Sequence, residues 1–246
     1  MAAAKNIVLV TGANGGIGLE LVSQLLSDAS KLVLLGCRSV SKGEVAIKDL
    51  ESKRQPGTVE LLEVDVSSED SIEDAAKAVE TKYGRLDALV NNAAVAFGQG
   101  TMAQQMAQCF QTNAIGPMVM VDKFAPLLSK SNGTPRIVNV SSGVGSIAKR
   151  LDPTSPGYNI AGEQYRVSKT ALNMVTACQV YHHGPKGFKI FAYCPGFCVS
   201  NLSENNNADN GAKPTSEGAA PIVKLLNGGR DAEHGCFVHE HGQYPW

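Results

Sequence analysis

The sequence has no apolar run approaching the roughly 20 residues that a membrane-spanning helix needs, which argues against an integral membrane protein. It also has no excess of either charge, since 22 basic and 23 acidic residues leave a net charge of −1. Nucleic acids and anionic membrane surfaces are bound by basic patches, so neither is an expected partner. The six cysteines form no CxxC pair, and the nearest two, Cys194 and Cys198, lack metal-ligand partners at useful spacing. We therefore expect reduced thiols and no metal site.

The two ends of the chain carry no targeting signal. The first five residues, Met-Ala-Ala-Ala-Lys, are too short for the apolar core of a signal peptide. The other end, Tyr244-Pro245-Trp246, matches no lipidation or peroxisomal signal. The sequence therefore predicts a cytoplasmic protein without a membrane partner.

Short apolar runs alternate with amphipathic stretches along the chain, without repeats or long linkers. Most runs are near-continuous in Val, Ile and Leu, as expected where helices cover both faces of a parallel sheet. They predict seven strands, at residues 6–11, 32–37, 59–65, 88–91, 136–141, 189–194 and 236–238. Helical spacing predicts helices at residues 17–27, 71–83, 104–128 and 164–182. The alternation predicts an α/β fold, a single Rossmann domain over residues 1–246 with a doubly wound, seven-stranded parallel sheet.

Two segments interrupt this rhythm. Residues 143–162 contain several prolines and glycines, and residues 200–214 are rich in Asn, Asp and Ser. Each follows a predicted strand, so each is expected to overhang the edge of the sheet where ligands bind. Both are predicted loops, either lids or plain connectors.

Glycines cluster at the end of the first predicted strand, where Thr11-Gly12-Ala13-Asn14-Gly15-Gly16-Ile17-Gly18 opens a helix. Glycines in such a turn let backbone N–H groups approach a pyrophosphate at the positive end of the helix. A purely structural turn is the alternative. Because the motif lies in the first strand–turn–helix unit, it favours dinucleotide binding.

The second predicted strand ends at Arg38 without an acidic residue. An acid at this position would bind the adenosine ribose of NAD and repel a 2′-phosphate, whereas a guanidinium offers donors suited to phosphate. The pattern favours NADP over NAD, with a solvated surface arginine as the alternative. Asp65, just past the third strand, is expected either to accept a hydrogen bond from the adenine amino group or to cap a helix.

Further short motifs are spread along the chain after the glycine turn. They are Asn91-Asn92-Ala93-Ala94, Asn113, Asn139-Val140-Ser141-Ser142, Tyr165-Arg166-Val167-Ser168-Lys169 and Pro195-Gly196. In type and order these motifs resemble those of the short-chain dehydrogenase/reductase family, over essentially the whole chain. The final third, from Cys194-Pro195-Gly196-Phe197 onward, is similar to the carbonyl reductases of that family.

The resemblance implies NADPH-dependent reduction of a ketone or aldehyde, reversible as alcohol oxidation, with Tyr165 as the proton donor. Lys169 lies four residues later on the same helix face, and its charge is expected to lower the pKa of Tyr165. By the same resemblance, Ser142 binds the substrate carbonyl and Asn113 holds a water beside the lysine. The residues expected to bind NADP(H) are Gly12, Asn14, Gly16, Ile17, Gly18, Arg38, Asp65, Val66, Asn92, Ala93, Tyr165, Lys169, Pro195, Gly196 and Val199.

The sequence leaves alternatives for the substrate and the reaction. The expected partner is a small carbonyl compound or alcohol, in a pocket made apolar by Val95, Phe97, Met102, Val144, Phe197 and Leu202. The fold could also serve another reaction in a biosynthetic pathway, or a cofactor-bound regulator without turnover. The intact set of Asn113, Ser142, Tyr165 and Lys169 argues against the regulator.

The oligomeric state depends on the two long helices. They carry more apolar positions than one buried stripe needs, so we favour a homodimer that pairs through them. Ser142 and Tyr165 are 23 positions apart, more than in the common compact form of the family. The extra residues, within 143–162, offer the alternative of a monomer in which this loop covers the helices.

Overall fold

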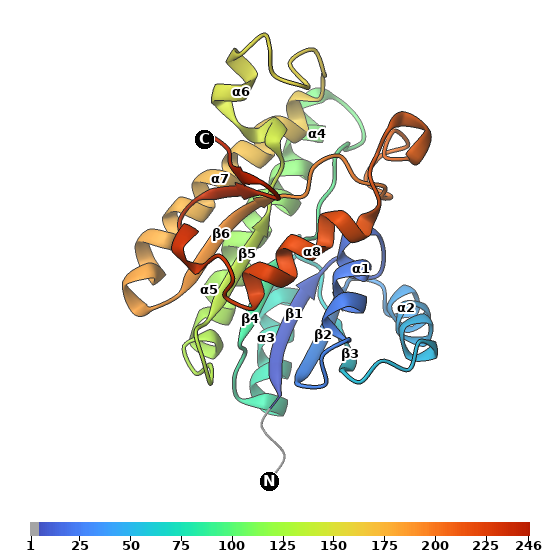
Figure 1. Ribbon diagram of the computed structural model, residues 1–246, viewed down its shortest axis with the longest axis vertical. Coiled ribbons are helices and arrows are strands. Elements are labelled where there is room, and N and C mark those ends of the chain that lie inside the picture. The colour runs from blue at the N-terminus through green and yellow to red at the C-terminus, as the bar shows by residue number, and fades with distance from the viewer. Residues whose placement is uncertain (1–4) are drawn as a thin grey trace.

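The computed structural model describes residues 5–246 and is built around an eight-stranded sheet (Figure 1). The strands lie in the order β3-β2-β1-β4-β5-β6-β7-β8, the first seven parallel and β8 antiparallel to β7. The Rossmann-like α/β fold is thus confirmed. The predicted count of seven strands was wrong by one, because β8 is only two residues long and has no apolar run. The bounds are β1 Asn6–Thr11, β2 Lys31–Cys37, β3 Thr58–Glu63, β4 Ala88–Asn91, β5 Arg136–Val140, β6 Lys189–Cys194, β7 Phe237–His239 and β8 Gly242–Gln243.

Helices cover both faces of the sheet, with α1, α2 and α8 on one face and α3, α5 and α7 on the other (Figure 1). Within residues 5–246, no helix is long and apolar enough to cross a membrane. The segment judged too short for a signal peptide lies almost wholly outside the described residues. The helices are α1 Gly16–Leu25, α2 Val40–Ser52, α3 Glu69–Tyr83, α4 Met102–Phe110, α5 Gly116–Leu128, α6 Ile147–Leu151, α7 Glu163–His183 and α8 Thr215–Leu226.

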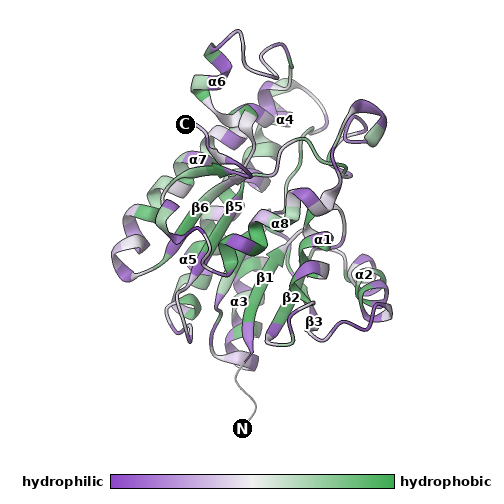
Figure 2. Cartoon of the chain, in the orientation of Figure 1, coloured by the Kyte–Doolittle hydropathy of each residue, from purple (hydrophilic) through white to green (hydrophobic). Residues whose placement is uncertain are grey.

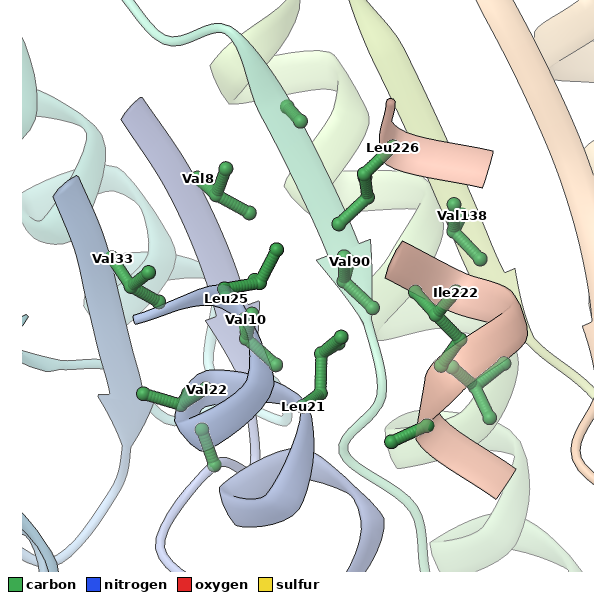
Figure 3. Close-up of a cluster of buried hydrophobic side chains, with 14 of the residues drawn as sticks. Val8, Val10, Leu21, Val22, Leu25, Val33, Val90, Val138, Ile222 and Leu226 are labelled. Carbon is green, nitrogen blue, oxygen red and sulfur yellow. The ribbon is translucent and has the colours of Figure 1, made fainter. Parts of the chain in front are cut away.

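The core consists of two apolar layers, one on each side of the sheet. Successive side chains of a strand point to opposite faces, so Val8 and Val10 of β1 pack on one side and Ile7 and Leu9 on the other. Figure 3 shows the first layer, in which strand valines meet Leu21 and other residues of α1 and α8. In Figure 2 the central strands are accordingly green and many outer helix positions purple.

The predicted helix over residues 104–128 is interrupted in the structure. Helix α4 ends at Phe110, a π-helical turn occupies Gln111–Ile115, and α5 follows. π-turns inside helices are frequent at functional sites. This one carries Asn113, so the interruption lies where the sequence places a functional residue.

The expected loop at residues 143–162 contains the short helix α6 and is tied to helix α7. The buried Arg166 guanidinium donates hydrogen bonds to the backbone carbonyls of Val144 (3.2 Å), Ile160 (2.8 Å) and Gly157. The chain beyond β8 packs on α6, where the Ser146 hydroxyl donates to the carbonyl of Pro245 at 2.7 Å. The loop is therefore held at both of its ends.

Candidate active site

An open cleft of about 440 Å³ lies at the carboxyl ends of the parallel strands. It is next to the boundary between β1 and β4, where the strand order reverses and ligands bind in such folds. Of the residues predicted to bind a cofactor, those that line it are Gly12, Asn14, Gly16, Ile17, Arg38, Asp65, Val66, Asn92, Ala93, Tyr165, Lys169 and Pro195.

The glycine turn packs tightly against the segment that follows β4. Gly12 has φ +64°, and a Cβ there would lie 2.8 Å from Ala93 Cα. Gly18 does not line the cleft. A Cβ on it would lie 2.5 Å from Asn92 Nδ2, so this glycine lets α1 pack against the end of β4. Asn92 Nδ2 donates to the Thr11 carbonyl at 2.8 Å, which fixes the turn to β4.

Two cations lie at the end of the cleft beyond β2. Arg38 and Lys42 both line it, both are exposed, and neither has a carboxylate within 4.0 Å among residues 5–246. Lys42 was missed in the sequence. Lys42 could have been found from its position, because it is a second basic residue four positions after Arg38, in the first turn of α2. The pair forms a site suited to a phosphate group.

Asp65 lines the cleft, but it does not cap a helix. The cap of α3 is Ser68, whose hydroxyl accepts a hydrogen bond from the Ser71 N–H at 3.3 Å. The Asp65 carboxylate instead accepts from the N–H and the hydroxyl of Ser67, at 2.9 and 2.6 Å. The capping alternative is therefore wrong.

Helix α7 brings Tyr165 and Lys169 to the inner wall of the cleft. Lys169 is buried, and its Nζ donates to the carbonyl of Val140 at 2.7 Å and lies 5.6 Å from the centroid of the Tyr165 ring. Burial lowers the pKa of Lys169 to about 7. Burial also raises the pKa of Tyr165, and the nearby Cys194 adds to this, while a hydrogen bond with Ser142 acts in the opposite direction.

This pKa of Tyr165 differs from the sequence expectation. From the sequence, only the positive charge of Lys169 was expected to act on the pKa of Tyr165. In the structure, the cost of burying a tyrosinate is the larger effect, so the pKa rises. The phenol is therefore protonated near pH 7. A protonated phenol beside a hydroxyl and a partly charged amine is an arrangement that can give a proton to a bound oxygen.

Two adjacent serines follow β5, and the structure separates their roles. The Ser141 hydroxyl is buried and donates to Asn173 Oδ1 at 2.6 Å, so it is used within the fold. The Ser142 side chain does not line the cleft. It is only partly buried and lies close enough to Tyr165 to lower the pKa of the phenol. Of the two, Ser142 has the hydroxyl that faces the tyrosine.

Asn113 is fully buried in the π-turn and does not line the cleft. Its side-chain amide accepts from the N–H of Val95 at 2.9 Å and donates to the Val95 carbonyl at 2.8 Å. It also donates to Ser168 Oγ at 2.9 Å. The side chain therefore clamps the segment after β4 to helix α7, directly beside Tyr165 and Lys169.

The segment after β6 covers the glycine turn. Ser200, Asn201 and Leu202 line the cleft, and a Cβ on Gly16 would lie 3.3 Å from Ser200 Cβ. Ser200 and Asn201 were not predicted from the sequence as site residues. The signal was their place directly after Pro195-Gly196 at the sheet edge. The expected Gly196 and Val199 lie beside the cleft instead, with Val199 lining a neighbouring hollow of about 270 Å³.

The chain is similar to known proteins over nearly its full length. The family model for short chain dehydrogenase matches residues 6–211. A short-chain dehydrogenase, anuI, from Penicillium roqueforti is 36% identical, covering 94% of this chain and 92% of that protein. A (+)-neomenthol dehydrogenase from Arabidopsis thaliana is 31% identical, covering 93% and 94%.

Solved structures give the same result. The NADPH-bound carbonyl reductase from chicken fatty liver superposes with a TM-score of 0.82 at 27% identity, covering 99% of this chain and all of that one. Carbonyl reductase Sniffer of Drosophila melanogaster gives a TM-score of 0.81 at 25% identity, covering 99% and 100%. The family resemblance expected from the motifs is confirmed, and the chain belongs to the short-chain dehydrogenase/reductase family of oxidoreductases.

Proposed function

We propose that this oxidoreductase reduces a ketone or aldehyde with NADPH and, in reverse, oxidises the alcohol. The observation that supports the proposal most is the phenol of Tyr165, which is protonated near pH 7, lies close to Ser142 and lines the same cleft as the glycine turn. A bound nicotinamide would supply the hydride. Ser142 would donate a hydrogen bond to the carbonyl oxygen, and Tyr165 would give that oxygen the proton that completes the alcohol.

Lys169 would serve the same reaction in two ways. Its pKa of about 7 leaves it partly charged at neutral pH, so it can stabilise the tyrosinate that remains after proton transfer. The Val140 carbonyl fixes its ammonium at the cleft wall. Asn113 would act as a positioning residue through Val95 and Ser168, instead of holding a water with its side chain.

The choice of NADP over NAD rests on Arg38 and Lys42. Both line the cleft beyond β2 and pair with no carboxylate of residues 5–246, so two positive charges are available for a 2′-phosphate. The bound dinucleotide would run from this pair over the glycine turn to Lys169. The similar carbonyl reductase from chicken fatty liver has NADPH bound in its crystal structure, which agrees with this assignment.

An apolar rim supports an aromatic or aliphatic substrate. Phe97, Met102 and Phe197 are 57%, 51% and 46% exposed, and each belongs to a segment that follows a strand's carboxyl end. We propose that they contact the part of the substrate away from the carbonyl. Such exposure of large apolar side chains near a cleft is typical of ligand-binding surfaces.

We also propose that residues 1–246 form a single domain that pairs as a homodimer. Large apolar side chains of α5 and α7 are exposed, among them Met174 at 66% and Tyr181 at 76%. Arg166 holds the 143–162 loop near the start of α7, which leaves these side chains uncovered.

The six cysteines are all free, which fits the reducing conditions of the cytoplasm.

The decisive experiment measures NADPH oxidation with a panel of aromatic and aliphatic aldehydes and ketones. The wild-type chain should turn over part of the panel, and Tyr165→Phe should lose at least about a hundredfold of the rate while it still binds NADPH. Tyr158→Phe, a change in the partly exposed loop, is the matched control and should keep the wild-type rate. A Tyr165→Phe protein with near-normal turnover would contradict the mechanism.

A further inference from the structure

A lysine without a carboxylate partner lies beside Ser142. Lys149 of α6 has its Nζ 4.1 Å from the centroid of the Tyr244 ring. Within residues 5–246, no carboxylate lies within 4.0 Å of this ammonium. The nearby Asp152 carboxylate accepts from the N–H and the hydroxyl of Thr154 instead, and Glu240 pairs with Lys213 at 2.8 Å.

The position of Lys149 is set from several directions. The Tyr244 ring beneath it stacks on His239, with centroids 4.2 Å apart and planes 15° apart, and packs edge-on against Phe237. The Lys149 N–H donates to the Ser146 hydroxyl, which in turn donates to the Pro245 carbonyl. The ammonium thus rests on a fixed aromatic surface, an arrangement that costs little side-chain entropy when an anion binds.

Gly143 connects this lysine to the reacting groups. It follows Ser142 directly, and a Cβ on Gly143 would lie 3.2 Å from Tyr244 Cε2 and 3.7 Å from Lys149 Cε. The Gly143 N–H donates to Cys194 Sγ at 3.0 Å, and that sulfur is close enough to Tyr165 to raise the pKa of its phenol. Lys149 therefore lies on the β6 side of Ser142, whereas the glycine turn lies on the β1 side.

The charge of Lys149 is not used on a dinucleotide. The cleft that fits the cofactor is lined by Arg38, Lys42 and Lys169, whereas Lys149 does not line it. If Ser142 binds the carbonyl, a cation beside Gly143 and outside the cleft is placed to contact another part of the substrate. The chemistry that fits it is an oxygen anion on the substrate itself.

We propose that Lys149 binds an anionic oxygen of the substrate, so that the substrate class is a carbonyl compound carrying a carboxylate or a phenolate. The proposal rests on the proposed reductase function. The carbonyl would bind at Ser142, and the anion would lie over the Gly143 backbone against the Lys149 ammonium. Tyr244 would form the wall behind them and act as a positioning residue for Lys149.

Matched probes test the proposal with NADPH as the reductant. The first pair is 4-formylbenzoate and its neutral methyl ester, and the second is 4-hydroxybenzaldehyde and 4-methoxybenzaldehyde above and below the ionisation of the phenol. The wild-type chain should prefer one anion over its neutral partner by about tenfold in kcat/KM, as one hydrogen bond to a charged group predicts. The pair that shows the preference identifies the anion.

The variants separate binding at Lys149 from a general effect of charge. Lys149→Met should remove the preference and leave the neutral probes unchanged, while Lys149→Arg should keep it. Lys130→Met removes a charge from the loop after α5, where Lys130 pairs with Glu80, and should behave as wild type. Equal rates for anionic and neutral probes in the wild type, or equal losses for both in Lys149→Met, would overturn the proposal.

Calorimetry distinguishes failure of the subsite from failure of the reductase function. 4-(Hydroxymethyl)benzoate should bind the wild-type chain with NADP⁺ present about tenfold more tightly than it binds Lys149→Met. Equal affinities would refute the subsite whatever the turnover. If this difference appears but no probe is reduced, the subsite stands and the proposed reductase function fails.

Discussion

Lys169 should reduce the stability of the fold that it serves. Folding lowers its pKa from 10.5 to about 7 because the ammonium is buried. At about 1.4 kcal/mol per pH unit, and with the lysine half protonated in the folded chain at pH 7, its burial costs about 4 kcal/mol. A methionine fills a similar volume without a charge, but it leaves the Val140 carbonyl without its donor, at a cost of about 1–3 kcal/mol. Lys169→Met should therefore stabilise the chain by about 1–3 kcal/mol at pH 7 while turnover is lost.

The pH dependence of the stability difference between Lys169→Met and wild type shows whether the buried charge is its cause. Because the pKa is lower in the folded state, the unfolded chain binds more protons between about pH 7 and pH 10.5, and wild-type stability rises with pH over this range. Methionine has no proton to lose, so the advantage of the variant should shrink as the pH is raised and level off below about pH 7. The pH range follows from the two pKa values.

Urea unfolding followed by circular dichroism measures both effects, for example at pH 7, 8 and 9. Lys186→Met, which removes an exposed lysine, is the control for the loss of one surface charge. The reasoning would be refuted if Lys169→Met were less stable than wild type at pH 7, or if the difference did not change with pH. Either result would mean that the lysine is accommodated without the cost of burial that its pKa implies.

Two further predictions concern the coenzyme and the assembly. Arg38→Asp should lower kcat/KM for NADPH by about tenfold or more and improve the use of NADH, because one of two phosphate ligands is lost and a like charge replaces it. Steady-state kinetics with both coenzymes checks this, and a wild-type chain that uses NADH as well as NADPH would contradict it. Light scattering at micromolar concentration should give a multiple of the 25.9 kDa chain mass. A mass near 26 kDa would exclude the dimer, and Met174→Glu should produce that mass from the dimer.

Much of the fold could be predicted because its central strands are buried on both sides. Runs such as Ile7–Val10 and Ile190–Ala192 are apolar throughout, and the structure places β1 and β6 at the predicted residues 6–11 and 189–194. Helix α2 was missed because it buries only Gly43, Ala46 and Leu50, which leaves a weak apolar periodicity. Helix α8 was also missed, because it contains Pro221 and Gly218, two residue types with low helix propensity.

The candidate site was harder to predict from the sequence where it depends on contacts between residues that are distant in the chain. Motif order could place Tyr165 and Lys169 together, but the pKa of the tyrosine follows from burial that only the packed fold reveals. Asn113 could be selected from its position, whereas its hydrogen bonds to Val95 and Ser168 require the π-turn. Lys149 had no signal at all, because its importance comes from Tyr244, which is 95 positions away in the chain.

The hydrogen bonds of Arg166 have a consequence for how the substrate range of such a chain can be altered. The guanidinium holds the 143–162 loop through hydrogen bonds to main-chain carbonyls only. These hydrogen bonds do not depend on which side chains the loop carries. Substitutions at positions such as Ile147, Leu151 or Ile160 can thus accumulate without loosening the loop from the catalytic helix. The exposed face of this loop is therefore open to directed mutagenesis, separately from the residues proposed to move the proton.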